Sequence, residues 1–382
     1  MKQRLAKLAL GLALVSWLSA LQHADALPES LRVRLFEAHP DLTTIEVLSG
    51  LTSLGAPALS SVPLHVTATL PGLRITGSGR TYPLMPQLEI KAKGKSIALK
   101  VNGKVRHYAG TIAFRSAVDS STHRAVLRAI NSVSTRDYVE SSVGSELQPG
   151  WPAEVAKAQA VMTQTILARC KPGEVLGDST QRNVYLGADY VRPGTAEQVR
   201  SVWNQILTYG GRPAVPFWYS TCAGRTSNGT DVFGSAAAAM PYLRSVKCDF
   251  CHDSPFWHET VRRIDQSQFA IVFGAQLPEF HGLDQAERPL SVSYVLHGKK
   301  QLLSGYQFWT LLGQKFGWDK APGLRFTLKQ QGHDVVVTST GAGHGVGLCG
   351  WGAAEQARQG KTYKQILQYY FPETEVTSIA PR

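Results

Sequence analysis

The fold is decided by residues 152–169, which read PAEVAKAQAVMTQTILAR. Apolar side chains recur in this stretch at helical spacing, at Val155, Ala158, Met162 and Ile166. Pro152 suits the first helical turn, because its missing N–H costs no hydrogen bond there. The pattern stops at a Lys-Pro-Gly sequence over 171–173. We therefore predict a helix over 152–169.

Upstream of this helix the sequence has the period of strands. Residues 31–35, 64–68 and 97–101 alternate apolar and polar side chains, and Asn102-Gly103 is a hairpin signal. Downstream, the patterns predict helices over 195–207, 304–316, 352–359 and 363–370, strands over 213–222, 324–329 and 334–339, and loop over 223–260. Helices and strands do not alternate regularly. We therefore predict an α+β protein with a β-rich N-terminal half, a mixed helix/strand core and long loops.

The first 26 residues have the composition of a secretory signal. Lys2, Arg4 and Lys7 precede an apolar run over 8–21, and Ala24-Asp25-Ala26 ends in small residues. A retained membrane anchor is the alternative, although the run is short for a bilayer. We expect an exported protein of the periplasm, cell wall or extracellular space, peripheral to a membrane at most.

The chain of 382 residues is basic, with a formal charge of +12. Loss of the signal removes three basic and one acidic side chain and leaves +10. Outside the cytoplasm this charge favours a polyanionic partner, such as an acidic wall polymer or a membrane surface. No nucleic acid partner is expected.

The five cysteines are Cys170, Cys222, Cys248, Cys251 and Cys349. The C-x-x-C-H string over 248–252 and a distant Cys222 supply the donors of a tetrahedral zinc site, namely Cys222, Cys248, Cys251 and His252. The competing interpretation is a disulfide from Cys222 to Cys248 or Cys251, as exported chains favour. The same string also occurs at haem c attachment sites.

Three further segments carry polar residues in fixed patterns. They read YVESSVGSEL over 138–147, with WP at 151–152 and AKAQAV at 156–161; YSTCAGRT over 219–226, with PYLRSV at 241–246; and GHGVGLCGWGA over 343–353. Together they closely resemble the stage II sporulation protein D / amidase-enhancer (LytB) family, from about Tyr108 to Phe371. We accordingly expect a signal peptide over 1–26, a β-rich region over 27–107, a family domain over 108–371 with a loop or zinc insertion at about 222–260, and a tail over 372–382.

The resemblance implies a protein that acts on peptidoglycan, and the enzymatic members of the family are lytic transglycosylases. Their catalytic glutamate falls on Glu146. One carboxylate suffices for this reaction, because the 6-hydroxyl of N-acetylmuramic acid attacks its own anomeric carbon and leaves a 1,6-anhydro end. A hydrolase would normally need a second carboxylate. Denuded MurNAc-GlcNAc strands are the expected substrate. The alternative is a non-catalytic modulator of an N-acetylmuramoyl-L-alanine amidase.

The same resemblance implies substrate contacts at Lys157, Gln159, Gln164, Ser220, Thr221 and His344. Gln164 stands where enzymatic members usually carry arginine, a difference that favours the modulator. His344 either lines the sugar site or holds its glycine-rich loop through backbone hydrogen bonds, and Cys349 five residues later invites a Cys–His nucleophile interpretation. Any zinc would be structural, because catalysis by Glu146 needs no metal.

Overall fold

The computed structural model describes residues 26–52, 63–77, 79–92, 94–180 and 183–380. Most of the predicted signal peptide lies outside these residues. The described chain forms two compact units, which we call the N-terminal unit (residues 26–206 with 378–380) and the C-terminal unit (residues 207–377). The predicted family domain of residues 108–371 includes parts of both. No helix among the described residues is long and apolar enough to cross a membrane.

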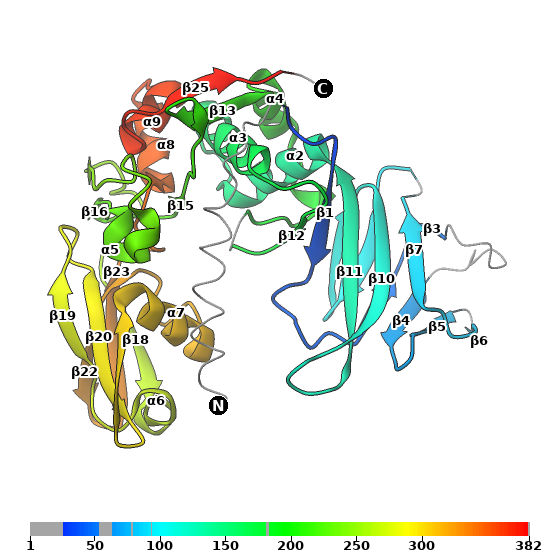
Figure 1. The fold of residues 1–382 in the computed structure, drawn as a ribbon, viewed down its shortest axis with the longest axis horizontal. Coiled ribbons are helices and arrows are strands. Elements are labelled where there is room, and N and C mark those ends of the chain that lie inside the picture. Colours follow the sequence, from blue (N-terminus) through cyan, green and yellow to red (C-terminus); the bar gives the residue numbers. More distant parts are fainter. Residues whose placement is uncertain (1–25, 53–62, 78, 93, 181–182, 381–382) are drawn as a thin grey trace. The chain divides into compact units, whose positions relative to one another are not determined.

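Two antiparallel sheets form the β-rich part of the N-terminal unit (Figure 1). The first has the order β12 (Val175–Gly177), β1 (Ser30–Leu35), β11 (Ala125–Ser134), β10 (Thr111–Val118), β7 (Gln87–Lys91) and β3 (Leu51–Thr52), with only β12 parallel to its neighbour. The second has the order β6 (Arg80–Thr81), β5 (Leu73–Gly77), β4 (Leu64–Ala68), β2 (Thr44–Val47), β8 (Ile97–Val101) and β9 (Lys104–Tyr108). Strand β4 contacts β10 and β11 of the first sheet.

Alternation of side chains explains why these strands form sheets with one buried face. In β1, Leu31, Val33 and Leu35 are buried while the residues between them are exposed. The predicted hairpin is present, because β8 pairs with β9 around Asn102 and Gly103, which both have positive φ.

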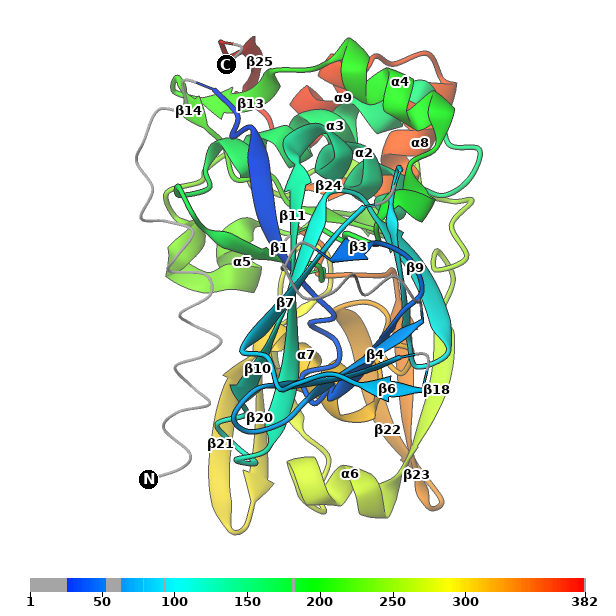
Figure 2. The same cartoon turned by 90° about the vertical axis from the view of Figure 1, so that its right-hand side faces the viewer.

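The helices of the N-terminal unit follow directly from the first sheet (Figure 2). Strand β11 runs into α2 (Thr135–Glu146), whose N-cap Ser134 accepts a hydrogen bond from the Asp137 N–H. Next come α3 (Ala153–Ala168), the short 3-10 helix η1 (Ala188–Tyr190) and α4 (Pro193–Ser201). Helix α2 contacts α3, α4 and η1. This contact holds the carboxyl-terminal end of α2 against the loop that leads to α4.

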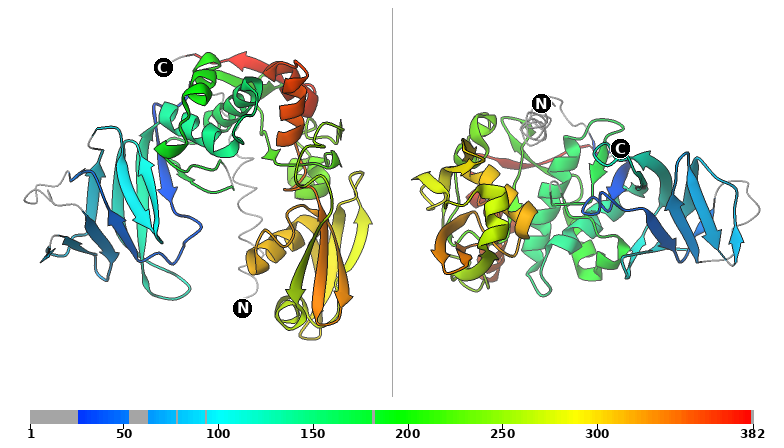
Figure 3. Two further views of the ribbon diagram at one scale, coloured as in Figure 1. Left: turned by 180° about the vertical axis from the view of Figure 1, so that it is seen from behind. Right: turned by 90° about the horizontal axis from the view of Figure 1, so that it is seen from below.

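The C-terminal unit combines several two- and three-stranded sheets with helices and loops (Figure 3). Its sheets are β14 (Arg212–Pro213), β13 (Gln205–Tyr209) and β25 (Glu375–Ser378); β15 (Trp218–Tyr219) and β24 (Leu348–Cys349); β16 (Gly224–Arg225) and β17 (Lys247–Cys248); β18 (Thr260–Asp265), β23 (Asp334–Thr340) and β22 (Arg325–Gln331); and β19 (Glu279–Leu283), β20 (Pro289–Leu296) and β21 (Lys299–Ser304). Its helices are α5 (Gly229–Phe233), η2 (Gly234–Ala237), α6 (Gln266–Phe273), α7 (Gly305–Phe316), α8 (Gly350–Arg358) and α9 (Tyr363–Tyr370).

The prediction of an α+β fold with a β-rich N-terminal half is confirmed. Most of the predicted helices begin and end within two residues of their predicted limits, but several regions differ, among them the predicted loop over 223–260, which contains α5, η2, β16 and β17. Helix α2 was not predicted. The helix expected over 195–207 ends at Ser201, because Asn204 adopts a positive φ and the chain continues as β13. The strand expected over 213–222 is reduced to the pairs in β14 and β15.

Candidate functional site

Glu146 is the last residue of α2, and its carboxyl is enclosed by protein while part of the residue reaches the surface. Its Oε1 accepts one hydrogen bond, from the Val184 N–H at 3.0 Å. Burial raises the pKa of Glu146 to about 7, against the lowering effect of the Val184 N–H. The negative end of a helix dipole also disfavours a carboxylate at this position. The group is thus suited to carry a proton near neutral pH.

The loop after β12 is fixed so that Val184 meets Glu146. The Tyr185 ring stacks on Tyr138 of α2 at 5.1 Å, and its hydroxyl donates to Asn131 Oδ1 at 2.7 Å. Two residues later, the Gly187 carbonyl accepts a hydrogen bond from Ser141 Oγ of α2 at 2.7 Å. The buried ring and the two hydrogen bonds hold the Val184 N–H in place.

Gly144 lets the loop approach this closely. A Cβ at Gly144 would lie 1.8 Å from the carbonyl oxygen of Tyr190, at the end of η1. Position 144 of α2 therefore has to be glycine for η1 to keep its place against the helix. Arg192, just beyond, donates to the Leu147 carbonyl at 3.3 Å and satisfies part of the helix end.

Two other carboxylates of these helices already have partners. Glu140 of α2 is buried and receives a hydrogen bond from Arg200 Nε at 3.0 Å. Glu154 of α3 pairs with Lys157 Nζ at 2.6 Å. No charged side chain contributes to the shift of the Glu146 pKa among the described residues. Glu146 is therefore a single carboxyl rather than one of a closely coupled pair.

The three predicted contacts on α3 have different surroundings. Lys157 is half-buried in its pair with Glu154. Gln159 is buried, and its Oε1 has no hydrogen-bond partner in the described part of the chain. Gln164 is fully buried: its amide donates to the Ala160 and Val202 carbonyls and accepts from the Asn204 N–H at 2.8 Å. The position of Gln164 thus joins α3 to the chain after α4 and offers no exposed surface to a substrate.

The predicted contacts of the C-terminal unit are hydrogen-bonded to other groups of the protein. Ser220 is half-buried, with its Oγ 3.1 Å from Thr221 Oγ1, and Thr221 is buried against Ser254 at 2.6 Å. Burial lowers the pKa of His344 to about 4, so its imidazole is neutral. Its Nδ1 accepts from the Val346 N–H at 3.2 Å, and its Nε2 therefore donates to the Trp218 carbonyl at 3.1 Å. Both ring nitrogens of His344 are thus engaged with backbone groups, which is the arrangement that the structural interpretation describes.

Four cysteine sulfurs converge in the C-terminal unit. Those of Cys222, Cys248, Cys251 and Cys349 all lie within 4.8 Å of one another, and the four residues are buried. The set differs from the predicted donors, because the ring of His252 lies against Trp257 at 3.9 Å and Cys349 supplies the fourth ligand atom. Cys349 Sγ has sulfur and backbone neighbours, and both ring nitrogens of His344 bond backbone groups, so the two side chains do not form a Cys–His pair.

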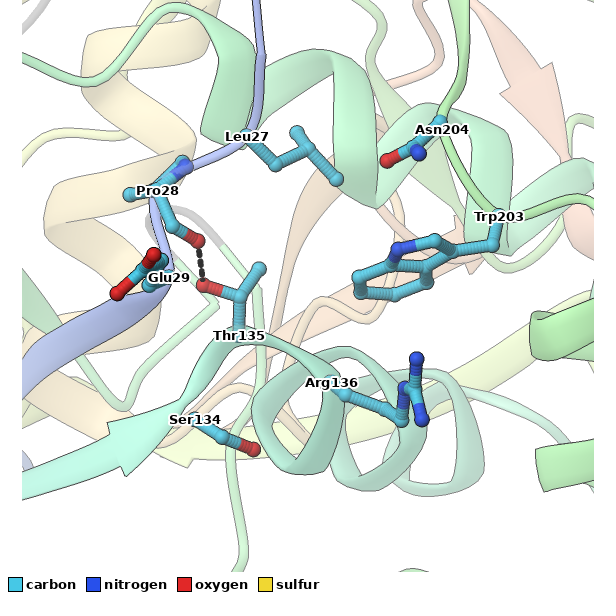
Figure 4. Close-up of a pocket in the computed structure, with 8 residues that line it drawn as sticks. All are labelled: Leu27, Pro28, Glu29, Ser134, Thr135, Arg136, Trp203 and Asn204. Carbon is cyan, nitrogen blue, oxygen red and sulfur yellow. Dashed lines mark hydrogen bonds between the residues drawn. The ribbon is translucent and has the colours of Figure 1, made fainter. Parts of the chain in front are cut away.

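One pocket of about 490 Å³ lies in the N-terminal unit, at the start of α2 (Figure 4). Its lining includes Thr135, which donates to the Pro28 carbonyl, and Arg136, whose guanidinium lies 5.5 Å from the centre of the Trp203 ring. Glu146, at the opposite end of α2, is not part of the lining. None of the residues that line this pocket is a predicted site residue.

The molecule combines a mixed α+β fold with a buried, protonatable glutamate and a separate cluster of four cysteines. Residues 123–209 match the family model described as "SpoIID: Stage II sporulation protein". This range includes Glu146, the Val184 loop and the three predicted contacts on α3, but none of the four clustered cysteines.

Similar proteins carry related names. The chain is 27% identical over 286 residues to stage II sporulation protein D of Bacillus subtilis, covering 69% of this chain and 80% of that protein. It is 27% identical to an uncharacterized protein of Brachyspira hyodysenteriae, of whose length it spans 66%, and 23% identical to the amidase enhancer of Bacillus subtilis, of which it spans 40%. The resemblance predicted from the motifs is confirmed: residues 123–209 match the stage II sporulation protein model, and proteins of that name are similar to most of the chain at modest identity.

Proposed function

We propose that this chain is an exported lytic transglycosylase that cleaves the glycan strands of peptidoglycan, with Glu146 as its acid and base. The observation that carries the proposal is the raised pKa of Glu146. Burial brings this pKa to about 7, and the carboxyl accepts a hydrogen bond from the Val184 N–H. A proton donor of this kind is what cleavage of a glycosidic bond requires. The family match over residues 123–209 includes the same glutamate.

In the first step, protonated Glu146 gives its proton to the oxygen that links C1 of N-acetylmuramic acid to the next sugar. The C1–O bond breaks as positive charge develops on the sugar ring, and the leaving strand departs as an alcohol. The Val184 N–H, held at 3.0 Å from Oε1, stabilises the carboxylate that Glu146 has become. This donor also keeps the carboxyl in one orientation throughout the reaction.

In the second step, the Glu146 carboxylate removes the proton of the 6-hydroxyl on the same muramic acid. The oxygen then bonds to C1 and closes the 1,6-anhydro ring, and Glu146 is again protonated. Protons and bonds balance with one carboxyl and no water. The pairing of Glu140 with Arg200 and of Glu154 with Lys157 supports this scheme over hydrolysis, which would need a second, available carboxylate.

A second function, modulation of a wall amidase without turnover, is favoured by two observations. One relative is named an amidase enhancer. Gln164, at the position where enzymatic relatives usually carry arginine, is buried in backbone hydrogen bonds and has no cationic group for a substrate. This function would involve the same wall polymer but would not depend on the proton of Glu146.

The deciding experiment is incubation of the purified protein with denuded glycan strands, followed by mass spectrometry of the products. We expect 1,6-anhydro ends from the wild type and from Glu197→Gln, a matched control on an exposed face of α4, and none from Glu146→Gln. Equal absence of product from all three proteins would leave the amidase modulator as the function. Ordinary reducing ends would instead establish a hydrolase.

A further inference from the structure

We propose that Cys222, Cys248, Cys251 and Cys349 together bind one zinc ion in a tetrahedral site made only of thiolates. Their sulfurs lie within 4.8 Å of one another, with 3.4 Å between Cys222 and Cys251. Four sulfurs at zinc-bonding distance of about 2.3 Å stand about 3.8 Å apart in a tetrahedron. The cluster therefore already has the dimensions of a zinc site, and the proposal is independent of the function of Glu146.

The backbone around the cluster is arranged to receive thiolates. Cys349 Sγ accepts hydrogen bonds from the Cys222 N–H at 3.3 Å and the Gly352 N–H at 3.4 Å. The latter donor belongs to the first turn of α8, whose positive end favours a negative sulfur. The Tyr370 hydroxyl lies 3.1 Å from Cys248 Sγ. Donors directed at sulfur are the second layer that metal sites use to orient their ligands.

Close packing leaves room for sulfur and for little else. A Cβ at Gly352 would lie 2.7 Å from Cys248 Sγ and 3.4 Å from Cys349 Sγ. The helix backbone at this glycine can approach two of the four sulfurs only because no side chain intervenes. All four cysteines are at most 1% exposed, so water does not compete for the ligand positions.

A buried arginine beside the cluster provides an electrostatic argument. Arg288 is 2% exposed and donates to the Cys222 carbonyl at 3.0 Å, the Ser227 hydroxyl at 3.0 Å and the Arg225 carbonyl at 3.2 Å. Among the described residues it forms no ion pair with a carboxylate. A buried guanidinium without a counterion is costly. Asp284 reaches this guanidinium only through the Ser227 hydroxyl. Four thiolates and one zinc ion carry a net charge of −2, which adds negative charge on the other side, next to the Cys222 carbonyl.

Such a site would be structural. All four positions are taken by protein sulfur, so no position remains for water or substrate. The ion would join the loop after β15, the C-x-x-C turn at β17 and the first turn of α8 within the C-terminal unit. Binding converts four thiols and one Zn²⁺ into the complex and releases four protons; no electrons are transferred.

The test combines metal analysis with cobalt substitution in the full chain. We expect one zinc per chain, released in step with the modification of four thiols by an organomercurial reagent. Co²⁺ in the same site should give sulfur-to-cobalt charge-transfer bands, which Cys349→Ser weakens by about a quarter, the share of one of four ligands. His252→Ala should leave the bands unchanged. Cys170→Ser should also leave them unchanged, because Cys170 lies in the N-terminal unit.

Two results would overturn the proposal. One is a metal-free protein whose intact mass is lower by four hydrogens, which would show two disulfides. The other is loss of cobalt bands in His252→Ala while Cys349→Ser keeps them, which would restore the donor set first expected from the sequence. Should Cys349→Ser not fold, the thiol count at zinc release from the wild type still decides between four sulfur ligands and three.

Discussion

The glutamate of the N-terminal unit and the cysteines of the C-terminal unit are both buried acids, but their surroundings differ. Glu146 has one hydrogen bond and no charged neighbour that shifts its pKa, and polar groups such as Ser142 Oγ and Gln159 Oε1 nearby in the sequence have no partner in the described chain. The four sulfurs have each other, backbone donors and a tyrosine hydroxyl.

This difference shows that burial alone does not determine the function of an acidic side chain. An incompletely paired acid is free to exchange its proton with a ligand, and its raised pKa reflects a cost to the folded state. A fully enclosed set of donors gains its free energy from one bound ion and has nothing left to offer a substrate. The predictions below test this contrast from its largest consequence to its smallest.

The largest expected effect is loss of turnover in Glu146→Gln. The amide keeps the shape and still accepts the Val184 N–H, but it cannot donate and recover a proton. We expect kcat/KM for anhydro-end formation to fall by about 100-fold to 10,000-fold, the range for loss of a general acid–base group. Mass spectrometry of the products measures it, with Glu197→Gln as control. Residual activity within threefold of the wild type would remove Glu146 from the mechanism.

Removal of the metal is next in size. Chelation should destabilise the C-terminal unit by about 4 kcal/mol, the contribution of a ligand present at a thousand times its dissociation constant. Calorimetry with and without chelator should show one transition move down in temperature while that of the N-terminal unit stays in place. A thermogram that does not respond to chelator would contradict the site.

Gly144→Ala tests the contact that positions the Val184 loop. The new methyl would lie 1.8 Å from the Tyr190 carbonyl oxygen, so we expect a loss of about 1–3 kcal/mol in the free energy of unfolding. Displacement of the loop should also remove the donor that lowers the Glu146 pKa, and the pH profile of activity should move to higher pH. Gly194→Ala is the control, because nothing lies within 4 Å of its Cβ. An unchanged pH profile in a destabilised Gly144→Ala would separate the two effects and disprove the positioning role.

Stability should depend on pH through Glu146. Its pKa in the folded chain, about 7, exceeds the ordinary value of 4.5, so the folded state holds the proton over this interval. The stability contribution is present in full below about pH 4.5 and is lost as pH rises to 7. Glu146→Gln should therefore be more stable than the wild type by about 1–3 kcal/mol at pH 8 and equal to it at pH 4. Denaturant titrations at the two pH values measure this; equal stability at both would mean that the carboxyl is solvated.

The smallest expected effect is that of Lys157→Met on folding. The Lys157 pair with Glu154 is partly exposed, and such pairs contribute about 0–1 kcal/mol. If Lys157 contacts the glycan, KM should nevertheless rise by several-fold, which a kinetic assay on denuded strands would measure. A change in stability without a change in KM would assign Lys157 to the helix alone.

The sequence predicted what depends on local pattern. Strand alternation in β1 gives one buried face, and apolar spacing in α3 marks a helix that is buried on nearly all sides, so these elements were found with nearly correct limits. Helix α2 was missed because its sequence, TRDYVESSVGSE, is polar and contains glycine and β-branched residues. It is helical because Tyr138, Val139 and Val143 pack against neighbours that local pattern does not reveal.

The candidate site divides in the same way. Glu146 was identified from its motif, whereas the Val184 donor depends on the fold of a loop 38 residues later and has no signal of its own. The C-x-x-C pair was evident, but Cys349 is 98 positions beyond Cys251 and was interpreted with its neighbour His344 instead. The odd cysteine count was the one hint that a fifth thiol had a separate place. No feature of the sequence singled out Arg288.

The spacing of the four cysteines imposes an order on the assembly of the proposed zinc site. Three of them lie within thirty residues of one another, and the fourth follows only after the strands and helices between Cys251 and Cys349. An ion captured early would be held by three sulfurs and remain exchangeable. Binding of the fourth sulfur would require that the intervening segment, which carries Arg288, has folded back onto Cys222.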